Sequence, residues 1–409
     1  MTATDSGFRF EYDPPVLRYG ERCVGELGDE LRRQGYDSAL VVCGRNVGKS
    51  EAVELVKDGL GDSLAGVFAE TTPRKRLETA FDALERMRDK DADAIVGLGG
   101  GSSLDVSRVV AALATRDETR DEMAREFLRT RLVTVGGTRT PPPVFVVPTT
   151  LAGADMSNAG GVTMSSETGL LDDDKVNAEI SGGFSDARLM PSAAFYDPTL
   201  FETTPRSALA GSAMNGFNKG TETLYSRNAT AVTDATAARG TRLLREGLVA
   251  YGEREEGLDS IAEGIMLVQY GISRGSVSTV SIIHAFGHAL RRGNDLQQGI
   301  AHAVITPHVL RYLSGKAEAN EDIDARTRLI ADALGVGDAE DEAEAVVDAV
   351  EEVRDALDLP TRLRDVDGPE PEEFDEVAEA VLKDIFLPNA PEGLDPTHEE
   401  MREVLEAAW

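Results

Sequence analysis

Ala94-Ile-Val-Gly-Leu-Gly-Gly-Gly-Ser-Ser-Leu104 is the stretch of this 409-residue chain that decides its fold. Its first five residues form a short apolar run that predicts a buried strand, and a helical pattern follows over Leu104–Leu113. Glycines between a strand and a helix let a phosphate approach the backbone, and the N–H groups at a helix N-terminus attract an anion. The stretch therefore predicts a cradle for the phosphates of a nucleotide, with a tight strand-to-helix turn as the alternative.

Two more apolar runs extend this unit in both directions along the chain, Ser38–Cys43 and Pro143–Pro148. Helical patterns at Glu51–Leu60 and Arg76–Asp89 lie between the first of these runs and Ala94. Strands that alternate with helices predict a parallel sheet with helices on its faces.

The pattern changes after about residue 190, where helical periodicity dominates, as in Pro205–Tyr225, Ala229–Tyr251 and Val280–Arg291. We therefore expect two domains. The first is an α/β N-terminal domain with a parallel nucleotide-binding sheet, residues 1–190, and the second is an all-α C-terminal domain, residues 191–409.

The charge of the chain excludes one class of partner. Asp and Glu number 73 against 42 Lys and Arg, which gives a formal net charge of −31. Such a charge opposes binding to the phosphates of nucleic acids. Only eight of the basic residues are Lys. This acid-rich, Lys-poor composition is typical of halophilic proteins, in which molar salt screens the self-repulsion of the carboxylates.

The distribution of apolar residues and cysteines gives expectations about location. No apolar run approaches the ~20 residues needed to span a bilayer, and the first ten residues lack the pattern of a signal peptide. Two cysteines, Cys23 and Cys43, cannot make a disulfide framework. We expect a cytoplasmic protein with no membrane partner.

The loop after the first predicted strand, Gly44-Arg-Asn-Val-Gly-Lys-Ser50, is not a P-loop, because it has too few residues between its glycines. In nucleotide folds the end of such a strand often meets the adenosine ribose, where an acidic residue binds the hydroxyls. This loop has Gly44 and Arg45 instead, so a 2′-phosphate can be admitted.

Four of the five histidines lie close together in the sequence: His284, His288, His302 and His308. His284 and His288 are four residues apart, so they share one face of a helix. This spacing suits metal binding or acid–base chemistry, while a lone histidine is more often structural.

Four segments, taken in order, resemble the iron-containing alcohol dehydrogenase superfamily: GGGSSLDVSR (99–108), PTTLAGADMSNAGGVT (148–163), YDPTL (196–200) and HAFGHAL…HAVITPHVL (284–310). The resemblance covers nearly the whole chain. It implies a nucleotide-binding α/β domain, a helical domain, an active site in the cleft between them and a homodimer or larger homo-oligomer. It also implies a nicotinamide cofactor bound at the matching positions Gly99, Gly100, Gly101, Ser102, Asp105, Thr149 and Thr150. With Gly44 and Arg45, NADP is slightly favoured over NAD.

Metal-dependent members of that family use four ligand positions. The positions that match them here are Asn215, Lys219, His284 and Gln298. Three of the four have changed: neutral amides are poor ligands for a divalent ion, and a protonated Lys repels one. The resemblance therefore implies that no metal is bound, and it is nearest to the metal-independent maleylacetate reductase branch, in which His302 also has a counterpart.

These residues lead us to expect a metal-independent NAD(P)H-dependent reductase or dehydrogenase of a small, anionic carbonyl or alcohol substrate. Lys219 would replace the metal as the positive electrophile, Asn215 and Gln298 would hold it or the substrate oxygen, and His284 or His288 would donate the proton.

Two alternatives remain open at this point. One is a metal-dependent alcohol or polyol dehydrogenase with a site rebuilt from His284, His288 and His302. The other is a non-redox lyase or cyclase similar to dehydroquinate synthase. Arg291 and Arg292, which follow the histidine helix, either bind an anionic substrate or face solvent.

Overall fold

The computed structural model describes residues 8, 10–165, 179–273 and 277–409. It divides into two compact units. The sheet unit comprises Pro14–Thr150 and Ala154–Thr204, and the helical unit comprises Met1–Asp13, Leu151–Gly153 and Pro205–Trp409.

The sheet unit is built on six parallel strands in the order β1-β8-β5-β4-β2-β3. The predicted parallel α/β fold is therefore confirmed, and the three predicted strands agree with β2, β4 and β5 to within a residue at each end. The central strands are apolar throughout because both of their faces are covered. The strands are β1 (Val16–Tyr19), β2 (Ala39–Gly44), β3 (Leu64–Thr71), β4 (Ala94–Gly99), β5 (Val144–Pro148) and β8 (Ala193–Tyr196).

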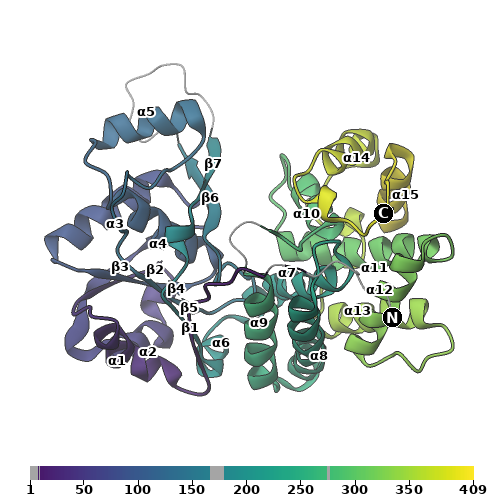
Figure 1. The fold of residues 1–409 in the computed structure, drawn as a ribbon, viewed down its shortest axis with the longest axis horizontal. Helices are drawn as coiled ribbons and strands as arrows, with labels where there is room; N and C mark the ends of the chain where they lie inside the picture. The colour runs from purple at the N-terminus through teal and green to yellow at the C-terminus, as the bar shows by residue number, and fades with distance from the viewer. Residues whose placement is uncertain (1–7, 9, 166–178, 274–276) are drawn as a thin grey trace. The chain divides into compact units, whose positions relative to one another are not determined.

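Helices cover the two faces of this sheet (Figure 1). On one face, side chains such as Val41, Val96 and Phe145 form an apolar core with helices α1 and α2. On the other face lie α3 and α4, and α4 packs closely on β4 and β2. The bounds are α1 (Leu27–Arg33), α2 (Glu51–Leu60), α3 (Leu77–Asp89) and α4 (Gly101–Leu113).

The sheet unit has further elements that the sequence did not predict. An antiparallel pair, β6 (Ala159–Met164) and β7 (Ile180–Ser185), stands apart from the main sheet and lies against α3 and α4 through β6. Helices α5 (Arg120–Thr130) and α6 (Pro198–Glu202) complete the unit. Strand β8 belongs to the sheet and begins at Ala193, beyond the domain boundary expected at residue 190.

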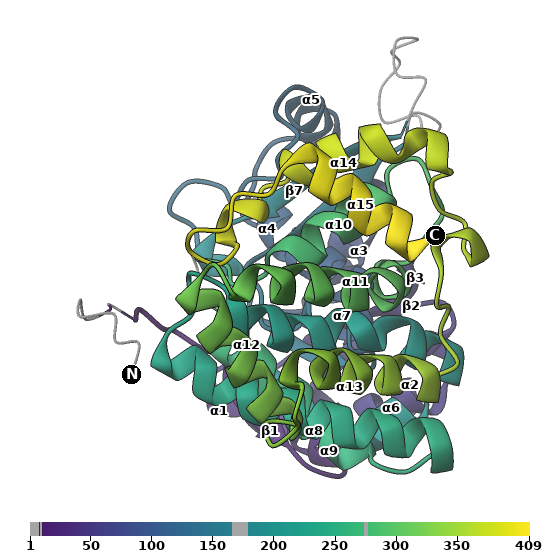
Figure 2. The same cartoon turned by 90° about the vertical axis from the view of Figure 1, so that its right-hand side faces the viewer.

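The helical unit contains nine described helices of the kind predicted and, among its described residues, no strand (Figure 2). Helix α7 is buried along most of its length, and it packs against α8, α9, α11 and α12. Among the described residues, no helix is long and apolar enough to cross a bilayer. The helices are α7 (Arg206–Tyr225), α8 (Ala231–Arg254), α9 (Leu258–Ile272), α10 (Ile282–Leu290), α11 (Gln298–Ala317), α12 (Glu321–Leu334), α13 (Glu342–Ala356), α14 (Phe374–Leu382) and α15 (His398–Ala408).

The contact between β4 and α4 depends on Gly97. A Cβ atom at this position would lie 2.8 Å from Oγ of Ser107 and 3.2 Å from the side chain of Leu104. By contrast, a Cβ atom at Gly66 of β3 would have no neighbour closer than 3.9 Å. The absence of a side chain at residue 97 therefore sets how closely α4, which begins at the predicted phosphate cradle, can approach the sheet.

We predict that Gly97→Ala lowers the free energy of unfolding by about 1–3 kcal/mol, because the added methyl group overpacks the β4–α4 contact. Gly66→Ala is the matched control in the same sheet, and we expect it to be neutral or slightly stabilising. Urea unfolding at one fixed KCl concentration measures both variants. Equal effects of the two substitutions would contradict the proposed close contact.

Candidate functional site

The strand order predicts the edge of the sheet at which a ligand binds. The order β3-β2-β4-β5-β8 is that of doubly wound folds in which the strand order reverses between the first and third strands, here β2 and β4. Ligands bind outside the carboxyl ends of the strands at such a switch point. The last residues of these two strands are Gly44 and Gly99, which are both among the predicted cofactor-binding residues.

The turn from β4 into α4 has the features of an anion cradle. Gly99 adopts φ +126°, a conformation that favours glycine, and Gly100 is the N-cap of α4 with no side-chain cap. The first turn of α4, with Gly101 and Ser102, carries no acidic residue.

Thr149 and Thr150 lie beside this turn. The backbone N–H of Thr149 donates to the carbonyl oxygen of Gly99 at 3.1 Å, and a Cβ atom at Gly100 would lie 3.2 Å from Oγ1 of Thr150. Of the residues predicted to bind the cofactor, Gly99–Ser102 and these two threonines therefore come together.

Asp105, also predicted to touch the cofactor, is buried on the next turn of α4. Its carboxylate accepts hydrogen bonds from Nζ of Lys75 at 2.5 Å and from Nη1 of the fully buried Arg108 at 3.1 Å. The side chain of Lys75 is partly exposed, so Lys75 is the member of this cluster that solvent reaches most easily. A direct contact of Asp105 with a cofactor stays a prediction.

The end of β2 carries an ion pair that the sequence did not predict. Arg45 donates to Oε2 of Glu70 from Nε at 3.2 Å and from Nη2 at 2.8 Å. Glu70 lies on the neighbouring strand β3, one residue before Thr71, which pairs with Gly44. The neighbouring strand β3 therefore supplies an acidic residue at the end of β2, where the loop after β2 has none.

In the helical unit, Lys219 and Asn215 project from the same face of α7 toward the loop Leu151–Gly153. The ammonium group of Lys219 donates to the carbonyl oxygen of Gly153, and the amide of Asn215 donates to the carbonyl oxygen of Ala152 at 3.0 Å. Gly153 has φ +69°, and a Cβ atom there would overlap the amide of Gln269 and lie 2.7 Å from Nζ of Lys219. Gln269, on α9, is thus a further neighbour of Lys219.

The second half of this site is built on Glu222, one helical turn after Lys219. Its buried carboxylate accepts hydrogen bonds from the backbone N–H groups of Ser281 and His284 at 3.0 Å each and also binds Nδ1 of His284. Burial raises the pKa of Glu222 to about 7. Burial, with the positive charge of Lys219, lowers the pKa of His284 well below its ordinary value. A neutral imidazole is therefore favoured at His284.

His302 lies against His284, with the two ring centroids 4.6 Å apart. The His302 side chain is fully buried, and burial lowers its pKa well below the ordinary value. Its Nε2 lies against the backbone of α10, where a Cβ atom at Gly287 would be 2.4 Å away. Within the described residues, neither ring nitrogen of His302 has a hydrogen-bond partner.

Gln298 and Arg291 adjoin this pair of histidines. Nη1 of Arg291 lies 3.4 Å from Oε1 of Gln298, and Nε of Arg291 donates to the carbonyl oxygen of Leu296 at 2.9 Å. The charge of Arg291 contributes to the lowered pKa of His302. The residue is exposed to solvent, so Arg291 lies at the outer edge of this group.

His288 occupies the more exposed part of the same helix face as His284. Its side chain is 34% exposed, and its Nδ1 lies 2.9 Å from Oδ2 of Asp384. The other oxygen of Asp384 accepts the backbone N–H of Phe386 at 3.0 Å, and the ring of Phe386 lies 5.3 Å from that of His288. A carboxylate bonded to Nδ1 leaves Nε2 of His288 to exchange a proton with a ligand.

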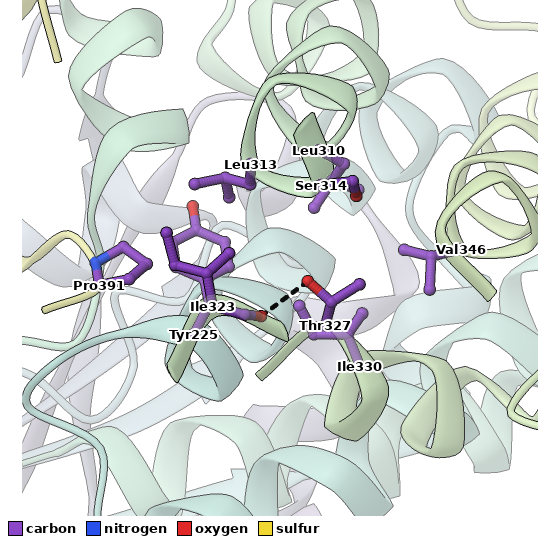
Figure 3. Close-up of a pocket in the computed structure, with 9 residues that line it drawn as sticks. All are labelled: Tyr225, Leu310, Leu313, Ser314, Ile323, Thr327, Ile330, Val346 and Pro391. Carbon is purple, nitrogen blue, oxygen red and sulfur yellow. Dashed lines mark hydrogen bonds between the residues drawn. The ribbon is translucent and has the colours of Figure 1, made fainter. Parts of the chain in front are cut away.

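The helical unit also contains a small pocket, which adjoins Tyr225 (Figure 3). Its wall consists of aliphatic side chains of α11, α12 and α13 together with Tyr225, Ser314, Thr327 and Pro391. The hydroxyl of Tyr225 donates to Glu222 at 3.3 Å. No predicted catalytic residue lines this pocket, so we do not assign the chemistry to it.

The structure thus brings the predicted catalytic residues into two neighbouring groups along α7, α10 and α11. Glu222, Asp384 and Gln269 are site residues that the sequence analysis missed, as is Glu70 in the sheet unit. The proposed rebuilt metal site finds no support, because in the described part of the chain no three His, Cys, Asp or Glu side chains are grouped to hold a metal ion.

Comparisons with known proteins agree with this fold. The family model for iron-containing alcohol dehydrogenase matches residues 14–198, and the C-terminal model of the Fe-containing alcohol dehydrogenase family matches residues 209–409. Lactaldehyde reductase of Escherichia coli (strain K12) is 27% identical over 403 residues, which cover 96% of this chain and 97% of that protein.

Solved structures share the same architecture. A crystal structure of 1,3-propanediol oxidoreductase superposes with a TM-score of 0.83 at 24% identity and covers 98% of this chain and 100% of its own. Maleylacetate reductase from Agrobacterium tumefaciens superposes with a TM-score of 0.76 at 20% identity, over 99% of this chain and 98% of its own. At these identities the likeness shows the fold alone.

Because the pKa of Glu222 is raised, the free energy of unfolding should depend on pH. The folded protein holds this proton up to a pH of about 7, whereas an unfolded glutamate, with its ordinary pKa near 4.5, has already lost it. Between these values the folded state binds more protons, so stability falls as pH rises, by at most about 1.4 kcal/mol per pH unit. Glu222→Gln removes this pH-dependent contribution to the free energy of unfolding.

We therefore expect the free energy of unfolding of the wild type, relative to Glu222→Gln, to fall between about pH 5 and pH 8 and to be constant above that range. Urea unfolding of both proteins across this range measures the difference. Parallel pH profiles would show that Glu222 ionises normally.

Proposed function

The chain belongs to the iron-containing alcohol dehydrogenase family, a family of oxidoreductases, and we propose that it is a metal-independent NAD(P)H-dependent reductase of small carbonyl compounds that carry an anionic group. The observation that carries this proposal is the position of Lys219. Its ammonium group binds Gly153 and acts electrostatically on His284, so a fixed positive charge adjoins the buried histidines.

The residues at the four metal-ligand positions of the family do not fit a divalent cation. Lys219 is a cation itself, and the amide of Asn215 donates to Ala152. Gln298 contacts the guanidinium of Arg291. Only His284 offers a good donor, and a single imidazole does not hold a divalent ion. The proposed mechanism therefore contains no step at a metal.

The sheet unit fits a nicotinamide dinucleotide. When bound, the reduced nicotinamide supplies a hydride to the carbonyl carbon of the substrate. The N-terminus of α4, with Gly99 to Ser102, would hold the pyrophosphate. Gly44 and Arg45 would receive the adenosine ribose and admit a 2′-phosphate, which favours NADP(H) slightly over NAD(H).

Lys219 provides the electrophile in this proposal. Negative charge develops on the carbonyl oxygen as hydride adds to the carbon, and a fixed positive charge near that oxygen stabilises the transition state. Asn215 and Gln269 lie beside Lys219 and would orient either the ammonium group or the substrate oxygen.

His288 is the better proton donor of the two histidines on α10. His284 is buried, and its lowered pKa keeps the ring neutral. His288 reaches solvent, and the carboxylate of Asp384 at its Nδ1 holds the ring so that Nε2 is the nitrogen that faces a ligand. Asp384 is therefore a positioning residue for the donor.

An anionic group on the substrate would find a partner in Arg291. This guanidinium lies beside Gln298 and is close enough to His302 to lower its pKa, while Arg292 makes no such contact among the described side chains. In a chain of net charge −31, a cation held next to the candidate catalytic residues favours a carboxylate or a similar group.

We predict that the purified enzyme oxidises NADPH with anionic carbonyl compounds in preference to neutral ones of the same length. Butanal and 4-oxobutanoate form one matched pair. We expect kcat/KM to be at least about tenfold higher for the anion, and Arg291→Gln to remove most of this difference. A preference for butanal would contradict the anionic assignment.

We also predict that Lys219→Met and His288→Gln each lower kcat by about 100-fold or more while leaving NADPH binding unchanged, because each removes a group that acts only on the reacting oxygen. Lys316→Met is the matched control, since Lys316 pairs with Glu400 away from the site. Undiminished turnover in Lys219→Met would exclude Lys219 as the electrophile.

A further inference from the structure

The ion pair between Arg45 and Glu70 stands at the carboxyl ends of β2 and β3, where the proposed function places the adenosine ribose. From this geometry we infer that Glu70 is a cofactor-specificity residue, which limits the preference for NADP(H) that Arg45 confers and maintains binding of NAD(H). The inference rests on the proposed function, because it assumes that a nicotinamide dinucleotide binds at this edge.

Position 44 has room for a ligand. A Cβ atom there would meet only the backbone oxygen and Oγ1 of Thr71, at 3.5 and 3.6 Å, which are ordinary contact distances. The packing of the strands therefore does not require glycine at this position. Because Gly44 has no side chain, space remains beside Arg45 and Glu70.

Both charged side chains are accessible to a bound molecule. The side chain of Arg45 is 68% exposed and that of Glu70 is 56% exposed. The backbone holds them together, because Gly44 of β2 pairs with Thr71 of β3 and the two charged residues adjoin these partners. Any group bound at the end of β2 therefore meets both charges.

The two charges act in opposite directions on a 2′-phosphate. Arg45 attracts it, while the carboxylate of Glu70, less than 3 Å from the guanidinium, both engages Arg45 and repels the phosphate. An exposed pair of this kind is weak, so a phosphate can compete for Arg45, but the repulsion remains. The pair of Arg45 and Glu70 therefore favours NADP(H) less strongly than Arg45 would without Glu70.

Glu70 also has the chemistry to bind the unphosphorylated ribose. Both hydrogen bonds from Arg45 end on Oε2, so Oε1 remains available among the described contacts as an acceptor. Acidic side chains at the ends of strands bind ribose hydroxyls in nucleotide folds. Here the acidic residue comes from the neighbouring strand β3 instead of the loop after β2.

The test is direct binding of NADPH and NADH, measured by fluorescence titration of the full-length protein at one fixed KCl concentration. The variants are Glu70→Gln, Arg45→Gln and Glu85→Gln. Glu85 is the matched control, since it pairs with Arg120 at 3.0 Å in the same unit and its side chain is 57% exposed. Thermal unfolding confirms that each variant is folded.

We expect Glu70→Gln to raise the ratio of the Kd for NADH to the Kd for NADPH by about fivefold or more, through tighter NADPH and weaker NADH binding. Arg45→Gln should lower the same ratio, and Glu85→Gln should leave it within about twofold of the wild type.

Failure of the inference about Glu70 and failure of the proposed function give different results. If the wild type binds both cofactors and Glu70→Gln leaves the ratio unchanged, the role of Glu70 is overturned and the proposed function stands. If the wild type binds neither cofactor, the proposed function is overturned, and the inference with it.

Discussion

The carboxylate of Glu222 fixes the arrangement on which the candidate catalytic site depends. It binds two backbone N–H groups at the start of α10 and the ring of His284, so it ties α10 to α7 one turn away from Lys219. Because His288 follows His284 by one turn, the same contact sets the position of the outer histidine. A carboxylate without these partners would be strongly destabilising in so buried a place.

His284 and His288 have similar partners but different roles. Each binds a carboxylate through Nδ1, Glu222 for His284 and Asp384 for His288. The inner pair is buried and favours neutral forms, which suits a structural and orienting part. The outer pair reaches solvent, which suits proton exchange. The difference comes from burial and not from the identity of the residues.

Much of the fold follows from local sequence, and much of the site does not. Apolar runs and helical periodicity are sufficient for β2, β4, α2 and α7, because each element carries its own pattern. The strands β1 and β8 have only four residues, too few for a pattern to stand out. The antiparallel strands β6 and β7 contain several glycines and lie well apart in the sequence, so no local pattern predicts that they pair.

The sequence analysis missed several site residues because their partners lie far away in the chain. Glu222 lies 62 residues from His284, Asp384 lies 96 residues from His288, and Glu70 lies 25 residues from Arg45. An acidic residue on a helix or strand is usually solvated in a chain this acidic. Only the tertiary fold shows which carboxylates meet a histidine or an arginine. One signal existed for Glu222, because it is the single acidic residue of α7 and lies one turn after Lys219.

The central claim is that Lys219 performs the electrostatic task of a metal ion. The most direct test is elemental analysis of protein purified in high salt, carried out on the same sample in which NADPH-dependent carbonyl reduction is measured. The account predicts an active sample with far less than one iron or zinc ion per chain and no loss of activity with a chelator. One metal ion per chain whose removal abolishes activity would contradict it.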